Sequence, residues 1–168
     1  MDFEITKTSL GQIKKGGHAI IKQRPCKIDD VKQSKTGKHG SMKVRLVGID
    51  CINKNKYELM APGHTPINTF KLVRKDYQLM NIIDNDDEPD VGIECICADS
   101  STTTIYIKKS LHSTMDSLDK LKQLLKSSEK SIEMVIITTP VQTSDNKDVG
   151  NDEFSCEHAI ESYKEQKE

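Results

Sequence analysis

Tryptophan is absent from this sequence of 168 residues, and aromatic residues make up only 4% of it. Any hydrophobic core must therefore rely on Ile, Val, Leu and Met, and a chain of this length buries one moderate core or two small ones. No run of eighteen apolar residues occurs, which excludes a transmembrane helix. The N-terminal stretch MDFEITKTSLGQ is acidic and polar, unlike a secretory signal. We therefore expect a cytoplasmic protein without membrane association.

Sequence patterns typical of metal sites and catalytic centres are also missing. The cysteines are odd in number and do not have the spacing of a disulfide framework; they are Cys26, Cys51, Cys95, Cys97 and Cys156. Neither the cysteines nor the histidines have zinc-ligand spacing, and no nucleophile elbow or local Cys–His signature occurs. We therefore expect reduced thiols, no catalytic residues, no metal site and no bound cofactor, and the sequence favours a protein that is not an enzyme.

The net charge of −1 conceals two halves of opposite sign. Residues 1–75 contain 16 Lys and Arg against 6 Asp and Glu, whereas residues 76–168 contain 9 against 20. This asymmetry is typical of a chain whose first half contacts a polyanion, and it is equally compatible with a solvated basic face on one domain.

The first half has the pattern of short strands separated by turns. Residues 18–31 hold two apolar runs that break at Arg24-Pro25, because proline cannot donate a hydrogen bond within a sheet. KVRLVGID (43–50) alternates as a half-buried strand does, and the polar turn 53–56 separates it from KYELM (56–60). Strands at this spacing predict a small barrel.

The second half combines strands with one helix. The strands are predicted at 77–83, 91–99, 102–110 and 131–140. Residues 112–127 change to a helical period, with leucines on one face. This order of elements is that of an OB-fold barrel, although other β-barrels with one helix share it.

The segment SKTGKHG (34–40) places Lys38 next to Gly37, with His39-Gly40 after it. It lacks the earlier glycine and the following Ser or Thr of a phosphate-binding Walker A loop. No carboxylate lies within five residues of His39, so the segment does not resemble a catalytic site either. What remains is a protruding hairpin loop from Gln33 to Met42, and its residues alone do not decide between a binding loop and an ordinary soluble hairpin end.

SKTGKHG, followed by KVRLVGID and then KYE, resembles the hypusine-containing translation initiation factor 5A family, and its eukaryotic branch in particular. RPCKI (24–28) and RKDYQL (74–79) extend the resemblance, which is dense over about 10–80 and is limited to element order over 81–142. It implies an N-terminal SH3-like barrel over residues 1–72 and an OB-fold barrel with one helix over 73–142. Residues 143–168 have no counterpart, and we expect them to be an acidic, mobile tail.

The resemblance also implies a role for Lys38. Deoxyhypusine synthase would add the aminobutyl group of spermidine to this lysine, and deoxyhypusine hydroxylase would convert it to hypusine. The protein would bind the E site of the ribosome and reach the acceptor end of the P-site tRNA, promoting peptide-bond formation on stalled, proline-rich sequences and assisting termination. The residues of the loop expected to accompany Lys38 in these contacts are Ser34, Lys35, Thr36, Gly37, His39 and Gly40.

Lys43 and Arg45 are candidates for contacts with RNA phosphates, and either can equally be a solvated strand charge. Two stretches depart from the family pattern. Ser41-Met42 stands where His-Ala is more common, and GHTPINTF (63–70) differs from the usual hinge between domains. Two rival hypotheses are a general RNA-binding module that needs no modified lysine, and an enzyme.

Overall fold

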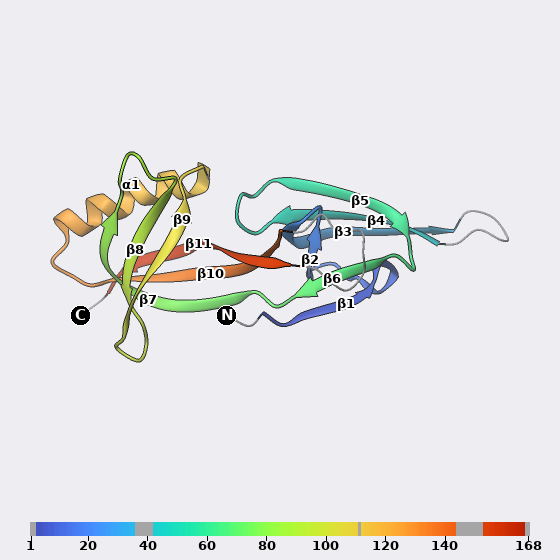
Figure 1. Ribbon diagram of the computed structural model, residues 1–168, viewed down its shortest axis with the longest axis horizontal. Coiled ribbons are helices and arrows are strands. Elements are labelled where there is room, and N and C mark those ends of the chain that lie inside the picture. Colours follow the sequence, from blue (N-terminus) through green and yellow to red (C-terminus); the bar gives the residue numbers. More distant parts are fainter. Residues whose placement is uncertain (1–2, 36–41, 111, 144–152, 167–168) are drawn as a thin grey trace. The chain divides into compact units, whose positions relative to one another are not determined.

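The computed structural model of the protein describes residues 3–35, 42–110, 112–143 and 153–166 (Figure 1). They form two antiparallel sheets and one α-helix, which confirms the mostly β fold with one helix. By their contacts, residues 1–72 and 139–156 form a first compact unit, and residues 73–138 and 157–168 form a second. No helix in the described part of the chain is both long and apolar enough to cross a membrane.

The first sheet has six strands in the order β1-β6-β2-β3-β4-β5. Its elements are β1 (Ile5–Ser9), the 3-10 helix η1 (Leu10–Gln12), β2 (His18–Ile21), β3 (Arg24–Lys35), β4 (Met42–Asp50), β5 (Lys56–Pro62) and β6 (Pro66–Phe70). The turn between β2 and β3 consists of Lys22 and Gln23, with φ of 50° and 71°. Two successive positive φ values match the twist of a tight hairpin. The sequence predicts the break at Arg24-Pro25, but both residues belong to β3 and pair with β2, so the turn lies two residues earlier.

The core of the first unit comes from alternate residues of its strands. Val44 and Leu46 of β4 are completely buried, and Ile21 of β2 and Ile28 of β3 pack in the same cluster. Gly48 of β4 is part of this packing, since a Cβ placed on it would lie 2.7 Å from Ile21 Cδ1. The strand therefore needs a residue without a side chain at this position.

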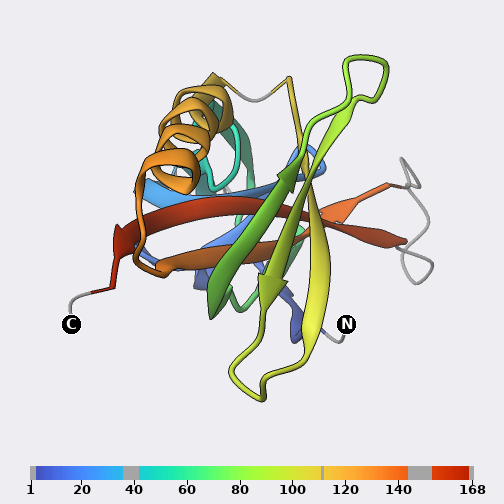
Figure 2. The ribbon, with the colours of Figure 1, turned by 90° about the vertical axis from the view of Figure 1, so that its left-hand side faces the viewer.

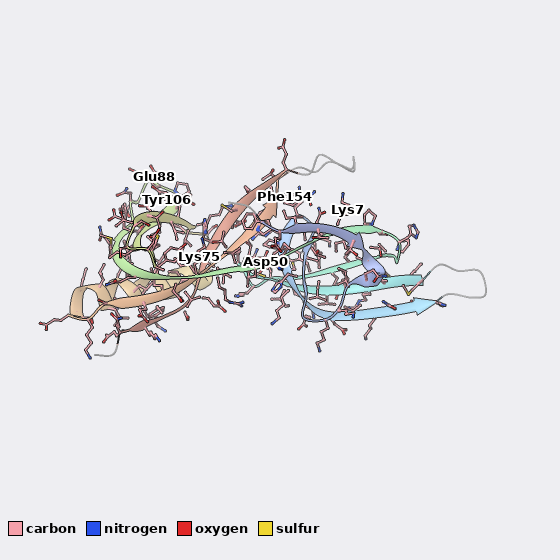
Figure 3. All side chains as sticks on the ribbon, turned by 90° about the horizontal axis from the view of Figure 1, so that it is seen from below. Lys7, Asp50, Lys75, Glu88, Tyr106 and Phe154 are labelled. Carbon is pink, nitrogen blue, oxygen red and sulfur yellow. The ribbon has the colours of Figure 1, made fainter. Side chains whose placement is uncertain are left out.

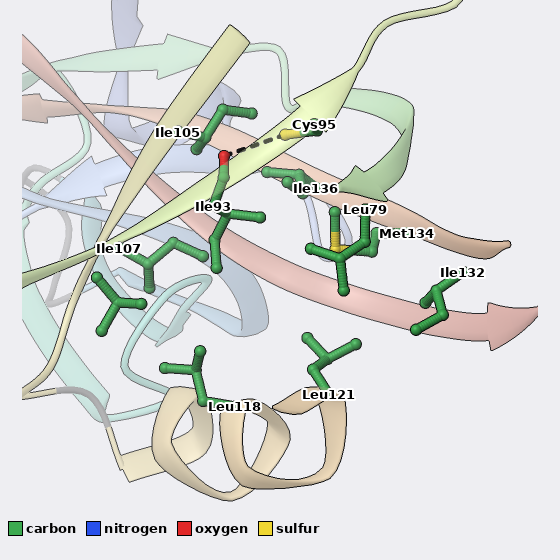
Figure 4. Packing of buried hydrophobic residues seen from close by; sticks show 11 residues of the cluster. Leu79, Ile93, Cys95, Ile105, Ile107, Leu118, Leu121, Ile132, Met134 and Ile136 are labelled. Atoms are coloured by element: carbon green, nitrogen blue, oxygen red, sulfur yellow. Dashed lines mark hydrogen bonds between the residues drawn. The ribbon is translucent and has the colours of Figure 1, made fainter. Parts of the chain in front are cut away.

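The second sheet has five strands in the order β11-β10-β7-β8-β9 (Figure 2). Its strands are β7 (Val73–Ile83), β8 (Asp90–Ile96), β9 (Thr102–Lys108), β10 (Ile132–Gln142) and β11 (Phe154–Glu165). The helix α1 (His112–Ser127) lies between β9 and β10 in the chain. Leu118 and Leu121 of α1 point from the helix into a cluster that includes Ile93, Ile107 and Met134 (Figure 4). Their spacing of three residues puts both leucines on the apolar face of the helix that the sequence predicts.

Two segments differ from the sequence-based expectation. Residues 154–165 form β11 and pair within the second sheet, so this part of the expected mobile tail is an ordered strand. It contains few large apolar residues, and its order comes from pairing with β10 rather than from its own pattern. Residues 66–70, within the stretch that departs from the family hinge, form β6 and pair with β1 from Ile5↔Phe70 to Ser9↔Pro66.

Candidate functional site

The candidate site is the hairpin of β3 and β4, which brackets the SKTGKHG segment. The two strands pair from Cys26↔Asp50 to Lys35↔Met42, with a bulge between Ile28 and Asp30. The ladder therefore continues beyond Gln33, and the connection between the strands is shorter than the loop from Gln33 to Met42 that the sequence predicts. Residues 36–41 make this connection and lie outside the described residues; among them are the predicted site residues Thr36, Gly37, Lys38, His39 and Gly40.

The remaining predicted site residues lie on the strands of this hairpin and on two different faces. Ser34 pairs with Lys43, and Arg45 lies two residues further along the same strand, so these three side chains share one face. Lys35 pairs with Met42 and therefore belongs to the opposite face. The structure thus brings Lys43 and Arg45 together near the connection but separates them from Lys35.

The charges on the shared face are only partly available for binding. The Arg45 guanidinium forms an ion pair with the Glu58 carboxylate on β5, with an Nη2–Oε1 distance of 2.7 Å. Lys43 is exposed and has no ion pair within the described part of the chain, and Lys32 opposite Arg45 is exposed as well. Lys32 and Lys43 are therefore the cations that this face offers to an anionic partner, while Arg45 is already partly neutralised.

Met42 is the first residue of β4, where the connection from β3 ends, and its contacts hold this end of the strand. Its methyl carbon Cε would lie only 3.0 Å from a Cβ on Gly11 and 2.8 Å from a Cβ on Gly63, so the two glycines leave room for the methyl group where it lies. The Gly63 N–H donates to the Met42 carbonyl at 2.7 Å, and the Gly11 N–H donates to the Gly63 carbonyl at 2.9 Å. The Gln33 side-chain amide adds a bond to the Gly11 carbonyl at 3.2 Å. We call this contact among Met42, Gly11 and Gly63 the methionine seat.

Sequence reasoning did not identify the methionine seat. Its glycines belong to SLGQ and APGH, which are separated by about fifty positions in the chain, and only the fold brings them to Met42. Gly11 follows Leu10 in η1, and Gly63 follows β5. Each glycine is a weak signal on its own, because glycine is also common in ordinary turns.

The opposite end of the hairpin is held by a buried ion pair. Arg24 begins β3, and its Nε lies 2.6 Å from Oδ2 of Asp50, which ends β4 and is completely buried. The Arg24 Nη2 also donates to Asp50 Oδ1 at 3.3 Å. Asp50 Oδ1 accepts the backbone N–H groups of Ile52 at 2.8 Å and Asn53 at 3.1 Å, so one carboxylate orders both the strand end and the following turn.

The second unit contains a pocket of about 490 Å³ lined by residues of β7, β8, β10 and β11 and of the segments that follow β8 and β11. Tyr77 and Tyr163 line it together with Glu133, Gln78 and Cys97. Burial raises the pKa of Tyr77, with smaller contributions from the neighbouring cysteines. Glu133 already accepts a bond from the Gln166 amide at 3.2 Å, and the Gln78 amide donates to Ser131 at 2.9 Å. No local pattern in the sequence predicts this pocket, because its lining comes from four separate strands.

Within the described residues, no group of three or more His, Cys, Asp or Glu side chains is arranged to hold a metal ion. The candidate site is therefore the hairpin, whose described strands offer two exposed cations, Lys32 and Lys43, on one face and end at the Arg24–Asp50 ion pair.

Residues 4–65 match the family described as translation initiation factor 5A-like, N-terminal. The chain is 49% identical over 72 residues to eukaryotic translation initiation factor 5A-1 of Schizosaccharomyces pombe, covering 43% of this chain and 46% of that protein. It is 44% identical over 100 residues to factor 5A-2 of Arabidopsis thaliana, covering 60% of this chain and 59% of that one. These matches therefore span about half of the length of the curated relatives.

Two solved structures have a similar fold. A translation initiation factor 5A family protein from Naegleria fowleri matches with a TM-score of 0.68 and 24% identity, over 91% of this chain and 98% of that one. Factor 5A from Methanococcus jannaschii matches with a TM-score of 0.55 and 23% identity, over 93% and 92%. At these identities the likeness concerns the fold, and it agrees with an SH3-like barrel followed by an OB-like barrel.

Proposed function

We propose that this chain, whose residues 4–65 match the translation initiation factor 5A-like family, is a member of that family and a ribosome-binding translation factor that acts through a hypusine formed at Lys38. It would occupy the E site and place the modified side chain near the acceptor end of the P-site tRNA. There it would promote peptide-bond formation on stalled, proline-rich sequences and assist termination. Its place of action would be the cytoplasm, and we propose no catalytic residue of its own.

The observation that carries this proposal is the position of Lys38 in the chain. The family match over residues 4–65 includes it, and it lies in the connection that follows the last β3–β4 pair, Lys35↔Met42. Gly37 and Gly40 leave little bulk near the lysine, which suits both the entry of Lys38 into a modifying enzyme and the later entry of the loop into a narrow ribosomal site.

The modification would change what the lysine can bind. Deoxyhypusine synthase would transfer the aminobutyl group of spermidine to Lys38 Nζ, and the remaining diamine would leave with the proton that Nζ loses. Deoxyhypusine hydroxylase, with O₂ and a reductant, would then add one hydroxyl oxygen. The longer side chain would carry two cationic centres, which can contact tRNA phosphate and sugar groups and hold the acceptor end in a reactive geometry.

The strands next to Lys38 support contacts with RNA. Lys43 and Lys32 are exposed on one face of the hairpin, and Lys35 is exposed on the other. We propose that these lysines neutralise ribosomal or tRNA phosphates while Ser34, Thr36, His39 and Gly40 shape the loop. Arg45 has a smaller part in this role because of its ion pair with Glu58. Affinity for the ribosome should then decrease as the salt concentration rises.

The decisive experiment compares Lys38→Arg with the control Lys14→Arg, at an exposed lysine outside the hairpin, in the full chain, each produced together with the two modifying enzymes. Intact-mass measurement should find one hydroxylated aminobutyl group on the wild type and on the control, and none on Lys38→Arg. Translation of a reporter with consecutive proline codons should be stimulated by the wild type and the control only. If unmodified Lys38→Arg stimulates translation equally, the general RNA-binding module is the better explanation.

A further inference from the structure

Tyr106 on β9 is 61% exposed although it lies in the middle of a strand. It pairs with Gly92 of β8, which in turn pairs with Ile83 of β7, so the three residues form one row across the sheet. Ile83 is 36% exposed. Ile105 and Ile107, the neighbours of Tyr106 along the strand, are buried in the core, which shows that this row belongs to the outer face of the sheet.

The Tyr106 ring rests against the strand beside it. A Cβ placed on Gly92 would lie 3.4 Å from Tyr106 Cε1, 3.4 Å from Ile83 Cβ and 3.3 Å from Thr104 Cγ2. The glycine thus leaves the space that lies between the ring and the isoleucine side chain. An exposed aromatic side chain that is supported in this way loses little conformational entropy when a partner covers it.

Acidic side chains of β8 lie beside this row, and Lys108, which pairs with Asp90, follows Tyr106 on the same face of β9. Asp90 and Glu94 flank Gly92 on the same face of β8, at the distance of diagonal neighbours from Tyr106. Pro89 accepts the backbone N–H of Lys109 at 3.0 Å, which brings the acidic turn before β8, including Glu88, next to the end of β9 (Figure 3). Within the described residues, Asp90, Glu94 and Glu88 have no ion pair, whereas the nearby Lys108 contacts Glu157 at 3.7 Å.

We propose that this outer face, formed by Tyr106, Ile83, Asp90 and Glu94, binds an arginine-bearing segment of a basic protein. A guanidinium can stack on the tyrosine ring and donate hydrogen bonds to a neighbouring carboxylate at the same time. The flat face of a sheet suits an extended segment, and the carboxylates steer a cationic partner toward it. Nucleic acid fits poorly, because its phosphates would meet unpaired carboxylates instead of the basic groove that single strands require.

This surface lies in the second unit and does not include Lys38. The binding proposal therefore goes beyond the proposed translation role, and disproving it would leave that role unaffected. Tyr106 and Ile83 also distinguish this face from a surface that is only acidic. Met60, the most exposed large apolar side chain of the first unit, is 64% exposed and serves as a matched control for Tyr106. Glu129 is an exposed carboxylate in the second unit outside this face and serves as the charge control.

The test titrates the full chain into a fluorescein-labelled peptide of alternating arginine and glycine, and measures anisotropy at low and moderate salt. We expect Tyr106→Ala to weaken binding about fivefold, since a central tyrosine contributes strongly to an interface. The double variant Asp90→Asn/Glu94→Gln should weaken it further and reduce its salt dependence. Met60→Ala and Glu129→Gln should bind like the wild type. Backbone NMR shifts should concentrate on Ile83, Gly92, Glu94 and Tyr106.

A lysine–glycine peptide of the same length should bind less well, because an ammonium does not stack as a guanidinium does. The proposal is overturned if the arginine peptide does not bind, or if it binds Tyr106→Ala as tightly as it binds the wild type. It is also overturned if a single-stranded RNA oligonucleotide binds this face in preference to the peptide. Urea unfolding of each variant checks that the exposed substitutions leave the fold intact.

Discussion

Arg24 and Asp50 form a buried ion pair across the first and last residues of the β3–β4 hairpin, with Nε 2.6 Å from Oδ2. The Asp50 carboxylate is completely buried, whereas 19% of the Arg24 side chain is exposed. Because two backbone N–H groups of the following turn also donate to Asp50, this carboxylate joins three segments of the first unit. The hairpin that carries Lys38 therefore depends on a charge that water cannot reach.

Replacing Arg24 should show this dependence. Arg24→Met would leave the Asp50 carboxylate buried without its counter-charge, and we expect the free energy of unfolding to fall by about 3 kcal/mol. Arg45→Met is the matched control, because its partner Glu58 is 53% exposed and the loss should stay below about 1 kcal/mol. Urea denaturation of both variants measures the difference, and equal losses would contradict a special role for the buried pair.

Gly48 should tolerate no side chain. A Cβ there would lie 2.7 Å from Ile21 Cδ1 and 2.8 Å from Cys26 Cβ, inside the closed core of the first unit. We expect Gly48→Ala to reduce the free energy of unfolding by about 2 kcal/mol, the usual cost of overpacking. Gly92→Ala, also within a strand, would meet side-chain atoms only at 3.3 Å or more, and it should cost less than about 1 kcal/mol. Thermal unfolding compares the two.

The cysteines should differ sharply in reactivity. Burial, with smaller contributions from Asp50 and Cys51, raises the pKa of the Cys26 thiol to about 12, and burial raises that of Cys95 to about 11. Both are completely buried, so almost no accessible thiolate exists at pH 8. Iodoacetamide should therefore modify the exposed Cys156 in the native protein long before Cys26 or Cys95, as peptide mass spectrometry would detect. Rapid native labelling of Cys26 would disagree with the packing; in urea every cysteine should react.

His158 should make the second unit less stable in mild acid. Burial lowers the pKa of His158, and the adjacent Glu157 opposes this shift only in part. As the pH falls below about 6.5, the unfolded chain takes up a proton that the folded state still resists, so the free energy of unfolding decreases. The Thr138 hydroxyl lies 2.7 Å from His158 Nδ1, and Lys108 contacts Glu157 from β9.

The urea midpoint at pH 7.5 and pH 5.5 measures this effect. His158→Asn should show a smaller loss between the two pH values than the wild type does. His64→Asn serves as the control, because His64 is exposed and should keep the wild-type difference. If His158→Asn loses as much stability between pH 7.5 and pH 5.5 as the wild type does, His158 is not the cause of the loss.

The sequence predicted those elements whose own pattern is strong. The helix at 112–127 was predicted with its observed bounds, because leucines at helical spacing require no knowledge of the partner surface. β11 escaped prediction because its polar, sparsely apolar sequence becomes a strand only beside β10. β6 escaped for a related reason: it begins with Pro66, which reads as a turn residue but is acceptable at the first position of a strand.

Local sequence patterns also predicted the position of the hairpin that forms the candidate site. The glycines around Lys38 and the alternation of 43–50 are local signals, and they located the hairpin. The partners that hold it, Asp50 for Arg24 and the two glycines for Met42, lie far apart in the sequence and meet only in the fold. For the same reason, no sequence signal indicated that Glu58 pairs with Arg45 and reduces its availability to RNA.

The methionine seat also restricts how this chain can change over time. Met42, Gly11 and Gly63 share one small volume, so a substitution at any of them alters what the other two positions can accept. A side chain at 63 would displace the flexible end of Met42, whereas a side chain at 11 would also lie 3.2 Å from the Gly63 carbonyl oxygen and so stays restricted even beside a smaller residue at 42. Three positions distant in the sequence should therefore constrain one another, because all of them meet at the first residue of β4.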